Sequence, residues 1–154
     1  MRIQRSRAGD DRGFTLIELM VVVLIIGILL AIAIPTFLGA RSRSQDGVAK
    51  SSLRNTLTAA NVIYTDSLSY ATANVAGLTA AEGSLTYVAS PTQSTQPKQV
   101  SVLAGTTWAA AARSASGTCF LIRTTTAGAV TYGKVTTGAC SGARANTAAV
   151  DAAW

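Results

Sequence analysis

The chain contains no histidine, and acidic residues are scarce for its length. Of its 154 residues, seven are Asp or Glu, and the five that follow Gly13 are widely scattered (Glu18, Asp46, Asp66, Glu82 and Asp151). Zinc sites and general acid–base catalysis usually draw on imidazole and carboxylate groups, so both have little raw material here. The sequence also has no triad, metal-ligand spacing or phosphate-binding loop. We therefore expect no enzyme, no catalytic residue, no metal site and no cofactor.

Cysteine is equally rare, since Cys119 and Cys140 are the only two. They lie too far apart for a CxxC redox motif and lack the partners of a metal site. In an exported chain, an isolated pair in a small domain most often forms a structural disulfide, with two separate buried thiols as the alternative.

The net charge of +6 is modest and spread along the chain. The first thirteen residues supply +2 of it, and the chain from Phe14 onward supplies +4. Scattered Lys and Arg of this kind are typical of a solvated surface. The charge therefore does not indicate direct binding of nucleic acid.

Apolar residues are concentrated in one long run near the N-terminus. Residues 19–34 are all apolar or Gly, and with residues 14–17 the run reaches about twenty residues, enough for a helix to cross a bilayer. Glu18 is the only charge inside it. The segment before Phe14 is basic, which predicts a single pass with the N-terminus in the cytoplasm and everything after Pro35 outside.

Two ordinary interpretations of this run are possible, and each leaves something unexplained. A secretory signal peptide could be cleaved after residues 31–33 (Ala-Ile-Ala), but Pro35 would then be the second mature residue. A plain membrane anchor explains the hydropathy but gives Glu18 no partner. A charge at that depth costs roughly 2.5–3.5 kcal/mol and usually serves a function.

A third interpretation comes from residues 12–20 (Arg-Gly-Phe-Thr-Leu-Ile-Glu-Leu-Met), which resemble the class III leader junction of type IV prepilins and pseudopilins. The resemblance implies that a prepilin peptidase cleaves between Gly13 and Phe14 and methylates the new amine of Phe14. The apolar segment then stays with the mature protein.

The same resemblance gives Glu18 a role in filament assembly. It implies that the carboxylate is neutralised by the N-terminal amine of Phe14 on an adjacent copy. The physical argument agrees, because a carboxylate in an apolar bundle is tolerable only when it is paired. Gly27 and Pro35 fall where such pilins weaken the helix; Pro35 removes a helix hydrogen bond, and Gly27 also suits close packing of apolar helices.

Residues 36–68 continue the helix as an amphipathic segment, with Leu53, Leu57, Ala60 and Tyr64 on one face. The joined helix would be about 55 residues or roughly 80 Å long, so half of it must protrude from any small domain. A protruding apolar half must lie in a bilayer or in a bundle of like helices. One surface can therefore anchor stored subunits in lipid and later join copies into a helical homopolymer.

The remainder of the chain predicts a connecting loop over 71–84 and a small antiparallel sheet. The expected strands are 85–89, 99–103, 107–113, 118–125 and 129–135. The polar run 90–97 is a loop or a surface for modification. Trp108 and Trp154 fit core or rim contacts better than sugar-stacking positions. Pilin resemblance further implies that a bridge between Cys119 and Cys140 pins the C-terminal loop to the sheet.

These observations predict an α+β, pilin-like ladle: a long N-terminal helix with an apolar protruding half, packed by its distal half on the sheet. The expected parts are a cleaved leader (1–13), an apolar membrane and filament-core helix (14–35), an amphipathic half (36–70) and a loop-and-sheet domain (71–154). The resemblance implies a type IV pilin, best read as a major subunit, that leaves the membrane for an extracellular filament used in adhesion, motility or DNA uptake. Its partners would be its own copies, the peptidase, the pilus assembly machinery and, before assembly, membrane lipid. A type II secretion pseudopilin, a minor pilin and a membrane-anchored binding module remain the alternatives.

Overall fold

The computed structural model describes residues 13–154, so the predictions for residues 1–12 of the leader lie outside the described part of the chain. The chain divides into two compact units, one ending at Gly39 and the other running from Ala40 to Trp154. Helix α1 (Leu16–Ser67) contributes to both.

In the first unit α1 is an uninterrupted apolar helix. Thr15 precedes it and caps it, because the Thr15 hydroxyl oxygen accepts a hydrogen bond from the Glu18 amide at 3.2 Å. The helix passes through Gly27 and Pro35 without a break. The Thr36 hydroxyl donates to the Ile32 carbonyl oxygen at 3.1 Å. The helix is thus continuous at both residues, and a loosening of the stretch between Gly27 and Pro35 inside a filament stays a prediction.

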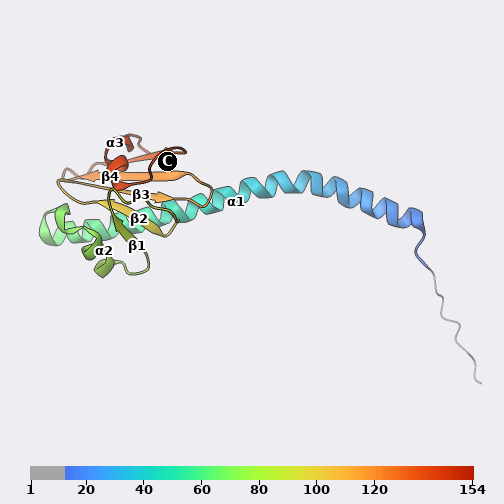
Figure 1. Cartoon of the computed structure of the whole chain (residues 1–154), viewed down its shortest axis with the longest axis horizontal. Helices are drawn as coiled ribbons and strands as arrows, with labels where there is room; N and C mark the ends of the chain where they lie inside the picture. The colour runs from blue at the N-terminus through green and yellow to red at the C-terminus, as the bar shows by residue number, and fades with distance from the viewer. Residues whose placement is uncertain (1–12) are drawn as a thin grey trace, which may run out of the picture. The chain divides into compact units, whose positions relative to one another are not determined.

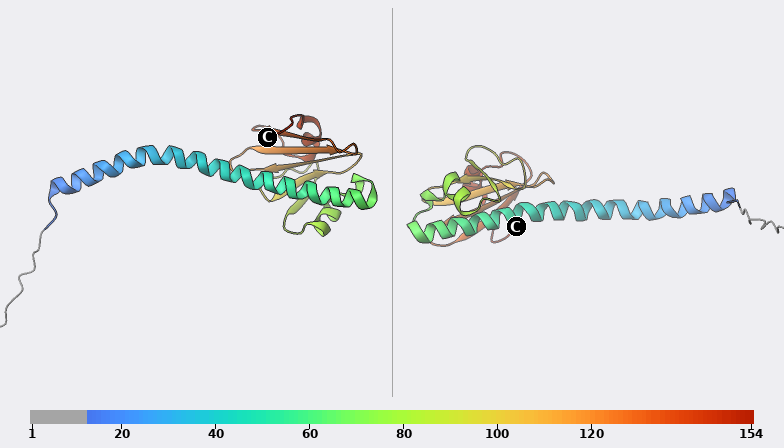
Figure 2. Two further views of the ribbon diagram at one scale, coloured as in Figure 1. Left: turned by 180° about the vertical axis from the view of Figure 1, so that it is seen from behind. Right: turned by 90° about the horizontal axis from the view of Figure 1, so that it is seen from below.

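The second unit is built on a five-stranded sheet with the strand order β1-β2-β3-β4-β5 (Figures 1 and 2). The strands lie within one residue of the predicted bounds: β1 (Thr86–Ala89), β2 (Gln99–Leu103), β3 (Thr107–Arg113), β4 (Cys119–Thr125) and β5 (Val130–Val135). Strands β2 to β5 pair antiparallel, as predicted.

The prediction of a purely antiparallel sheet is wrong at one edge, where β1 pairs with β2 in parallel. The connection between them is too long for a tight hairpin and returns along the sheet before β2 begins. Ser94 holds this return loop in place: its side chain is fully buried and donates to the Gln99 carbonyl oxygen at 2.6 Å. The Ser101 hydroxyl donates to the Thr92 carbonyl oxygen, also at 2.6 Å.

The sheet has a core on each face, because successive residues of a strand point to opposite sides. Trp108, Ala110 and Ala112 of β3 belong to the core that contains Leu53 and Ala60 of α1. The alternate residues Ala109 and Ala111 belong to a second core around helix α3 (Gly142–Ala148). The second unit thus has three layers, with α1 on one face of the sheet and α3 on the other (Figure 2).

Helix α3 was not predicted from the sequence, which indicated only a C-terminal loop there. Ser141 caps it by accepting a hydrogen bond from the Arg144 amide, and the Gly142 amide donates to the Ser101 hydroxyl oxygen at 3.1 Å. Gly142 allows the close approach, since a Cβ built there would lie 2.5 Å from the Leu103 nitrogen.

The predicted loop over 71–84 is wrong in part, because it contains the 3₁₀ turn η1 (Tyr70–Thr72) and helix α2 (Val75–Ala81). Asn74 caps α2 by accepting a hydrogen bond from the Gly77 amide at 3.1 Å. Leu78 of α2 is fully buried in the first core. Helix α1 ends at Ser67, one residue before the expected end at Leu68. Leu68 has a φ of 53°, in the left-handed region where helices commonly end.

Candidate assembly surfaces

The apolar part of α1 forms the largest exposed hydrophobic surface of the described residues. An 18-residue window of this helix has a mean hydropathy of 3.1, and none of it is buried. By length and composition this is the one helix in residues 13–154 that can cross a membrane. Such a surface is unstable in water and needs either lipid or other apolar helices around it.

Glu18 lies at the start of this surface with its carboxylate exposed. Its side chain accepts one long hydrogen bond, from the Thr15 hydroxyl at 3.4 Å. Phe14, four residues earlier, is 77% exposed. Both groups that the sequence assigns to assembly are therefore open to a neighbouring molecule, and their pairing across copies stays a prediction.

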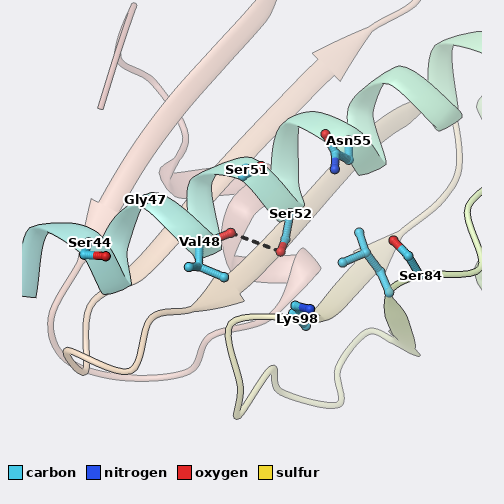
Figure 3. A pocket seen from close by; sticks show the side chains of 9 residues that line it. Ser44, Gly47, Val48, Ser51, Ser52, Asn55, Ser84 and Lys98 are labelled. Carbon is cyan, nitrogen blue, oxygen red and sulfur yellow. Dashed lines mark hydrogen bonds between the residues drawn. The ribbon is translucent and has the colours of Figure 1, made fainter. Parts of the chain in front are cut away.

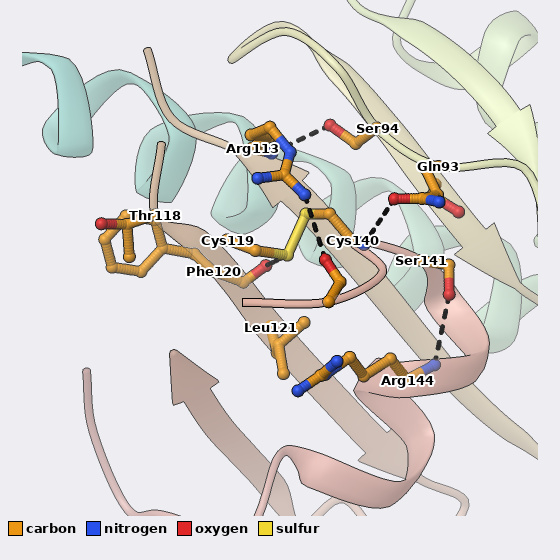
Figure 4. Close-up of a disulfide and its surroundings, with 12 residues drawn as sticks. Gln93, Ser94, Arg113, Thr118, Cys119, Phe120, Leu121, Cys140, Ser141 and Arg144 are labelled. Atoms are coloured by element: carbon orange, nitrogen blue, oxygen red, sulfur yellow. Dashed lines mark hydrogen bonds between the residues drawn. A yellow bond between two sulfur atoms is a disulfide. The ribbon is translucent and has the colours of Figure 1, made fainter. Parts of the chain in front are cut away.

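The disulfide between Cys119 and Cys140 is present, as the sequence analysis expected, with the two Cα atoms 5.6 Å apart (Figure 4). Cys119 begins β4 and Cys140 precedes α3, and both are buried in the second core. The Cys140 carbonyl oxygen accepts a hydrogen bond from the Ser94 amide at 2.8 Å. The bridge thus fastens the segment that leads into α3 to the sheet.

Arg113 reinforces the same region from the end of β3. Its guanidinium donates to the Gly117 carbonyl oxygen at 3.1 Å and to the Gly138 carbonyl oxygen at 3.3 Å. The side chain therefore links the β3–β4 turn to the loop that carries Cys140. These contacts give Arg113 a structural role in holding the loop.

An aromatic and cationic cluster lies between α1 and the β4–β5 side of the sheet. The Trp154 ring packs edge-on against Tyr132 and Phe120, with centroids 4.7 and 6.0 Å apart. The Lys50 ammonium lies 4.9 Å from the Phe120 centroid, and the Arg54 guanidinium lies 5.2 Å from the Trp154 centroid. The expectation of core or rim contacts for the two tryptophans is confirmed, since Trp108 is fully buried and Trp154 is partly buried.

Tyr87 of β1 is buried, and its hydroxyl oxygen makes no hydrogen bond within the described residues. Burial raises the pKa of this hydroxyl above its ordinary value. The nearby Thr56 hydroxyl partly offsets the effect, and the charge of Glu82 adds to it. Burial therefore favours the neutral form of the Tyr87 hydroxyl.

Comparison with known proteins agrees with the resemblance seen at the N-terminus. Residues 10–34, which include Gly13, Phe14, Glu18 and Gly27, match the family model described as the prokaryotic N-terminal methylation motif. A stretch of 66 residues is 48% identical to the type IV major pilin protein PilA of Myxococcus xanthus and covers 43% of this chain and 30% of that protein. A stretch of 69 residues is 42% identical to the type IV wide pilus major component PilA4 of Thermus thermophilus and covers 45% of this chain and 52% of that protein.

The matched stretches therefore span about half or less of each relative. No solved structure matches the chain significantly. The motif, the exposed apolar helix and the α+β domain together place the chain in the class of proteins with a prepilin-type N-terminus. Within that class, the two relatives are both major pilins, which confirms the resemblance to type IV pilin precursors.

Proposed function

We propose that the chain is the precursor of a type IV pilin and that its mature form is a major subunit of an extracellular filament. The observation that carries the proposal is the exposed apolar stretch of α1, which begins at an N-terminal methylation motif. The two relatives named as major pilins support the same assignment. The subunit is structural and needs neither a catalytic residue nor a cofactor for this role.

Processing starts from a single-pass membrane protein with a cytoplasmic leader, residues 1–13. A prepilin peptidase cuts between Gly13 and Phe14 and methylates the Phe14 amine. The apolar helix, residues 14–35, then holds the mature subunit in the cytoplasmic membrane. Residues 36–70 and 71–154 lie on the outer side of that membrane.

Assembly, carried out by the pilus machinery, transfers the apolar helix from lipid into a bundle of identical helices. Both environments are apolar, so the transfer costs little hydrophobic free energy. Glu18 would oppose it unless its charge were paired, and the Phe14 amine of a neighbouring copy supplies that pair. The pairing sets the axial register of neighbouring copies as well as their affinity.

A pseudopilin of type II secretion is the nearest alternative. The Cys119–Cys140 disulfide and the two major-pilin relatives favour the pilus subunit instead. The filament would act in adhesion, motility or DNA uptake, as pili of this family do.

The test is the N-terminal residue and intact mass of the mature protein from the cell that makes it. We expect a chain that begins at N-methylated Phe14. A start at Ile34 would indicate signal peptidase cleavage, and an intact N-terminus would indicate a plain anchor. Either of these results would contradict the proposal.

A further inference from the structure

Two shallow grooves lie along the outer side of α1, both within the unit that begins at Ala40. The first runs between α1 residues 44–55 and the chain at Ser84, Leu85 and Lys98 (Figure 3). The second lies between α1 and the end of α2, with a volume of about 340 Å³. Asn55 lines both, so the two grooves adjoin.

The second groove, which we call the Glu82 groove, combines an apolar wall with one carboxylate. Ala59, Val62 and Ala81 supply the apolar wall, and Glu82 lies at the end of α2. The Ser84 amide donates to a Glu82 carboxylate oxygen at 3.1 Å. Hydrogen bonding from the Ser84 side chain and amide lowers the pKa of Glu82 below its ordinary value. The groove therefore presents a fixed negative charge beside apolar surface.

This arrangement suits an arginine side chain better than other ligands. Its methylene stem can pack on alanine and valine, while its planar guanidinium pairs with a carboxylate in fixed geometry. A second copy of this chain can supply such an arginine.

Charge is segregated along the chain in a way that lets two copies complement each other. Residues 40–54 carry four basic side chains against the single acid Asp46. Residues 55–97 carry the acids Asp66 and Glu82 and contain no Lys or Arg. The lining of the Glu82 groove therefore contains one acidic and no basic side chain, whereas Lys98 lies in the adjoining groove. The basic region lies earlier on α1.

Two of the four basic residues are already engaged, since Lys50 and Arg54 lie over aromatic rings. Arg41 and Arg43 are exposed. At 3.6 residues per turn, Arg41 lies within about 40° of Asn55 around the helix, on the face of the groove itself, whereas Arg43 lies about 120° away. A helical polymer joins two different faces of its subunit, so Arg43 is the better partner.

We propose that the Glu82 groove of one subunit receives Arg43 of a second copy in the filament. This inference rests on the proposed function, because it requires copies arranged side by side along a fibre. It assigns a lateral contact between domains that is separate from the apolar helix bundle. The contact favours one register of neighbouring domains and disfavours those that bring like charges together.

Charge reversal tests the pairing. Glu82→Arg alone and Arg43→Glu alone should each lower the yield of fibres by about tenfold, because each places like charges in the contact. The double variant restores opposite charges and should recover the yield. Arg41→Glu is the matched control, with the same charge change at a neighbouring exposed position, and should assemble normally. Normal yields from both single variants, or a double variant no better than either, would overturn the proposal.

Cysteine cross-linking tests proximity directly in fibres. A subunit carrying both Glu82→Cys and Arg43→Cys should form a ladder of cross-linked oligomers on non-reducing gels after mild oxidation. The combination of Glu82→Cys with Arg41→Cys should not, and each single variant should stay monomeric. The native cysteines are buried and bridged, so they do not enter the exchange.

The outcomes separate the two proposals. If the unmodified chain forms no fibres in its own cell, the proposed function fails and the contact fails with it. If fibres form but the Glu82→Cys, Arg43→Cys variant gives no ladder, the contact alone is wrong.

Discussion

The indole nitrogen of Trp108 donates a hydrogen bond to the carbonyl oxygen of Ala73 at 3.1 Å, inside the core of the second unit. Trp108 belongs to β3, and Ala73 lies between the 3₁₀ turn and α2, so the bond joins segments 35 positions apart in sequence. Both residues are fully buried. The bond therefore fixes the α2 segment, and with it Glu82, against the sheet.

Trp108→Phe should test this link. The change removes the donor, leaves the Ala73 carbonyl oxygen unpaired in the core and opens a cavity, so we expect a loss of roughly 2–4 kcal/mol in the free energy of unfolding. Denaturant unfolding of the mature chain in detergent measures it, with the exposed change Thr126→Ala as control. A loss below about 0.5 kcal/mol, the range of ordinary surface changes, would contradict the assignment.

The disulfide should contribute about 3 kcal/mol to stability, because it closes a loop of 21 residues in the unfolded chain. The variant with both Cys119→Ala and Cys140→Ala should unfold at lower denaturant concentration by that amount. Addition of a reductant to the unmodified, unfolded chain should lead to the same shift, while the variant should not respond to it. Equal stability of the two proteins would show that the bridge adds nothing.

Stability should fall at alkaline pH because of Tyr87. Burial raises the pKa of Tyr87 in the folded chain, so its contribution is fully present below the unfolded value of about 10 and is lost as the pH rises through the folded value. Tyr87→Phe removes this dependence and also removes an unpaired buried hydroxyl, so its stability near neutral pH should match or exceed that of the parent. Unfolding measured between about pH 9 and pH 11 compares the two chains. A parallel loss in both would rule out Tyr87 as the cause.

Gly142→Ala should displace α3 from the sheet. The added Cβ would lie 2.5 Å from the Leu103 nitrogen and 2.7 Å from the Val102 carbonyl carbon, both backbone atoms that cannot move aside cheaply. We expect a destabilisation of roughly 1–3 kcal/mol, typical of overpacking. Gly83→Ala is the control, because its Cβ would meet only the Thr79 oxygen at 3.7 Å, an ordinary contact. Equal effects of the two changes would show that the close approach at Gly142 is not required.

Glu18→Ala and Glu18→Gln should both be processed at Gly13 yet assemble poorly. Neither variant offers a charge to the Phe14 amine of a neighbour, so the register of the bundle loses its main electrostatic determinant. Fibres sheared from the cell surface and quantified on gels measure assembly, and the mature N-terminal residue reports processing. Abundant, normal fibres from either variant would eliminate the proposed role of Glu18.

The sequence predicted the parts of this fold that depend on local hydropathy. The apolar run and the leucine-bearing face of α1 set a helix, and alternation along residues such as Val100 and Val102 set strands within one residue of their true bounds. The parallel pairing of β1 was missed, because it depends on the buried hydrogen bonds of Ser94, which no local pattern reveals. Helix α3 was missed because its seven residues are mostly alanine and polar and show no apolar period.

The candidate sites also differ in whether their residues are contiguous in the sequence. The sequence singled out Phe14 and Glu18 because they belong to a contiguous motif, and their roles in assembly stay a prediction. The Glu82 groove could not be found, because Glu82 and Val62 come together only through the packing of α2 on α1. One signal was available in the sequence: the absence of Lys and Arg from residues 55–97.

The four alanines at positions 109–112 form the middle of a strand that is enclosed on both sides. Each methyl group acts as a spacer between the sheet and a helical layer, with alternate positions serving α1 and α3. Enlargement at 110 or 112 would push against α1, whereas enlargement at 109 or 111 would push against α3 and the disulfide. Over evolution, this strand can therefore change only together with the helix that packs on the same side.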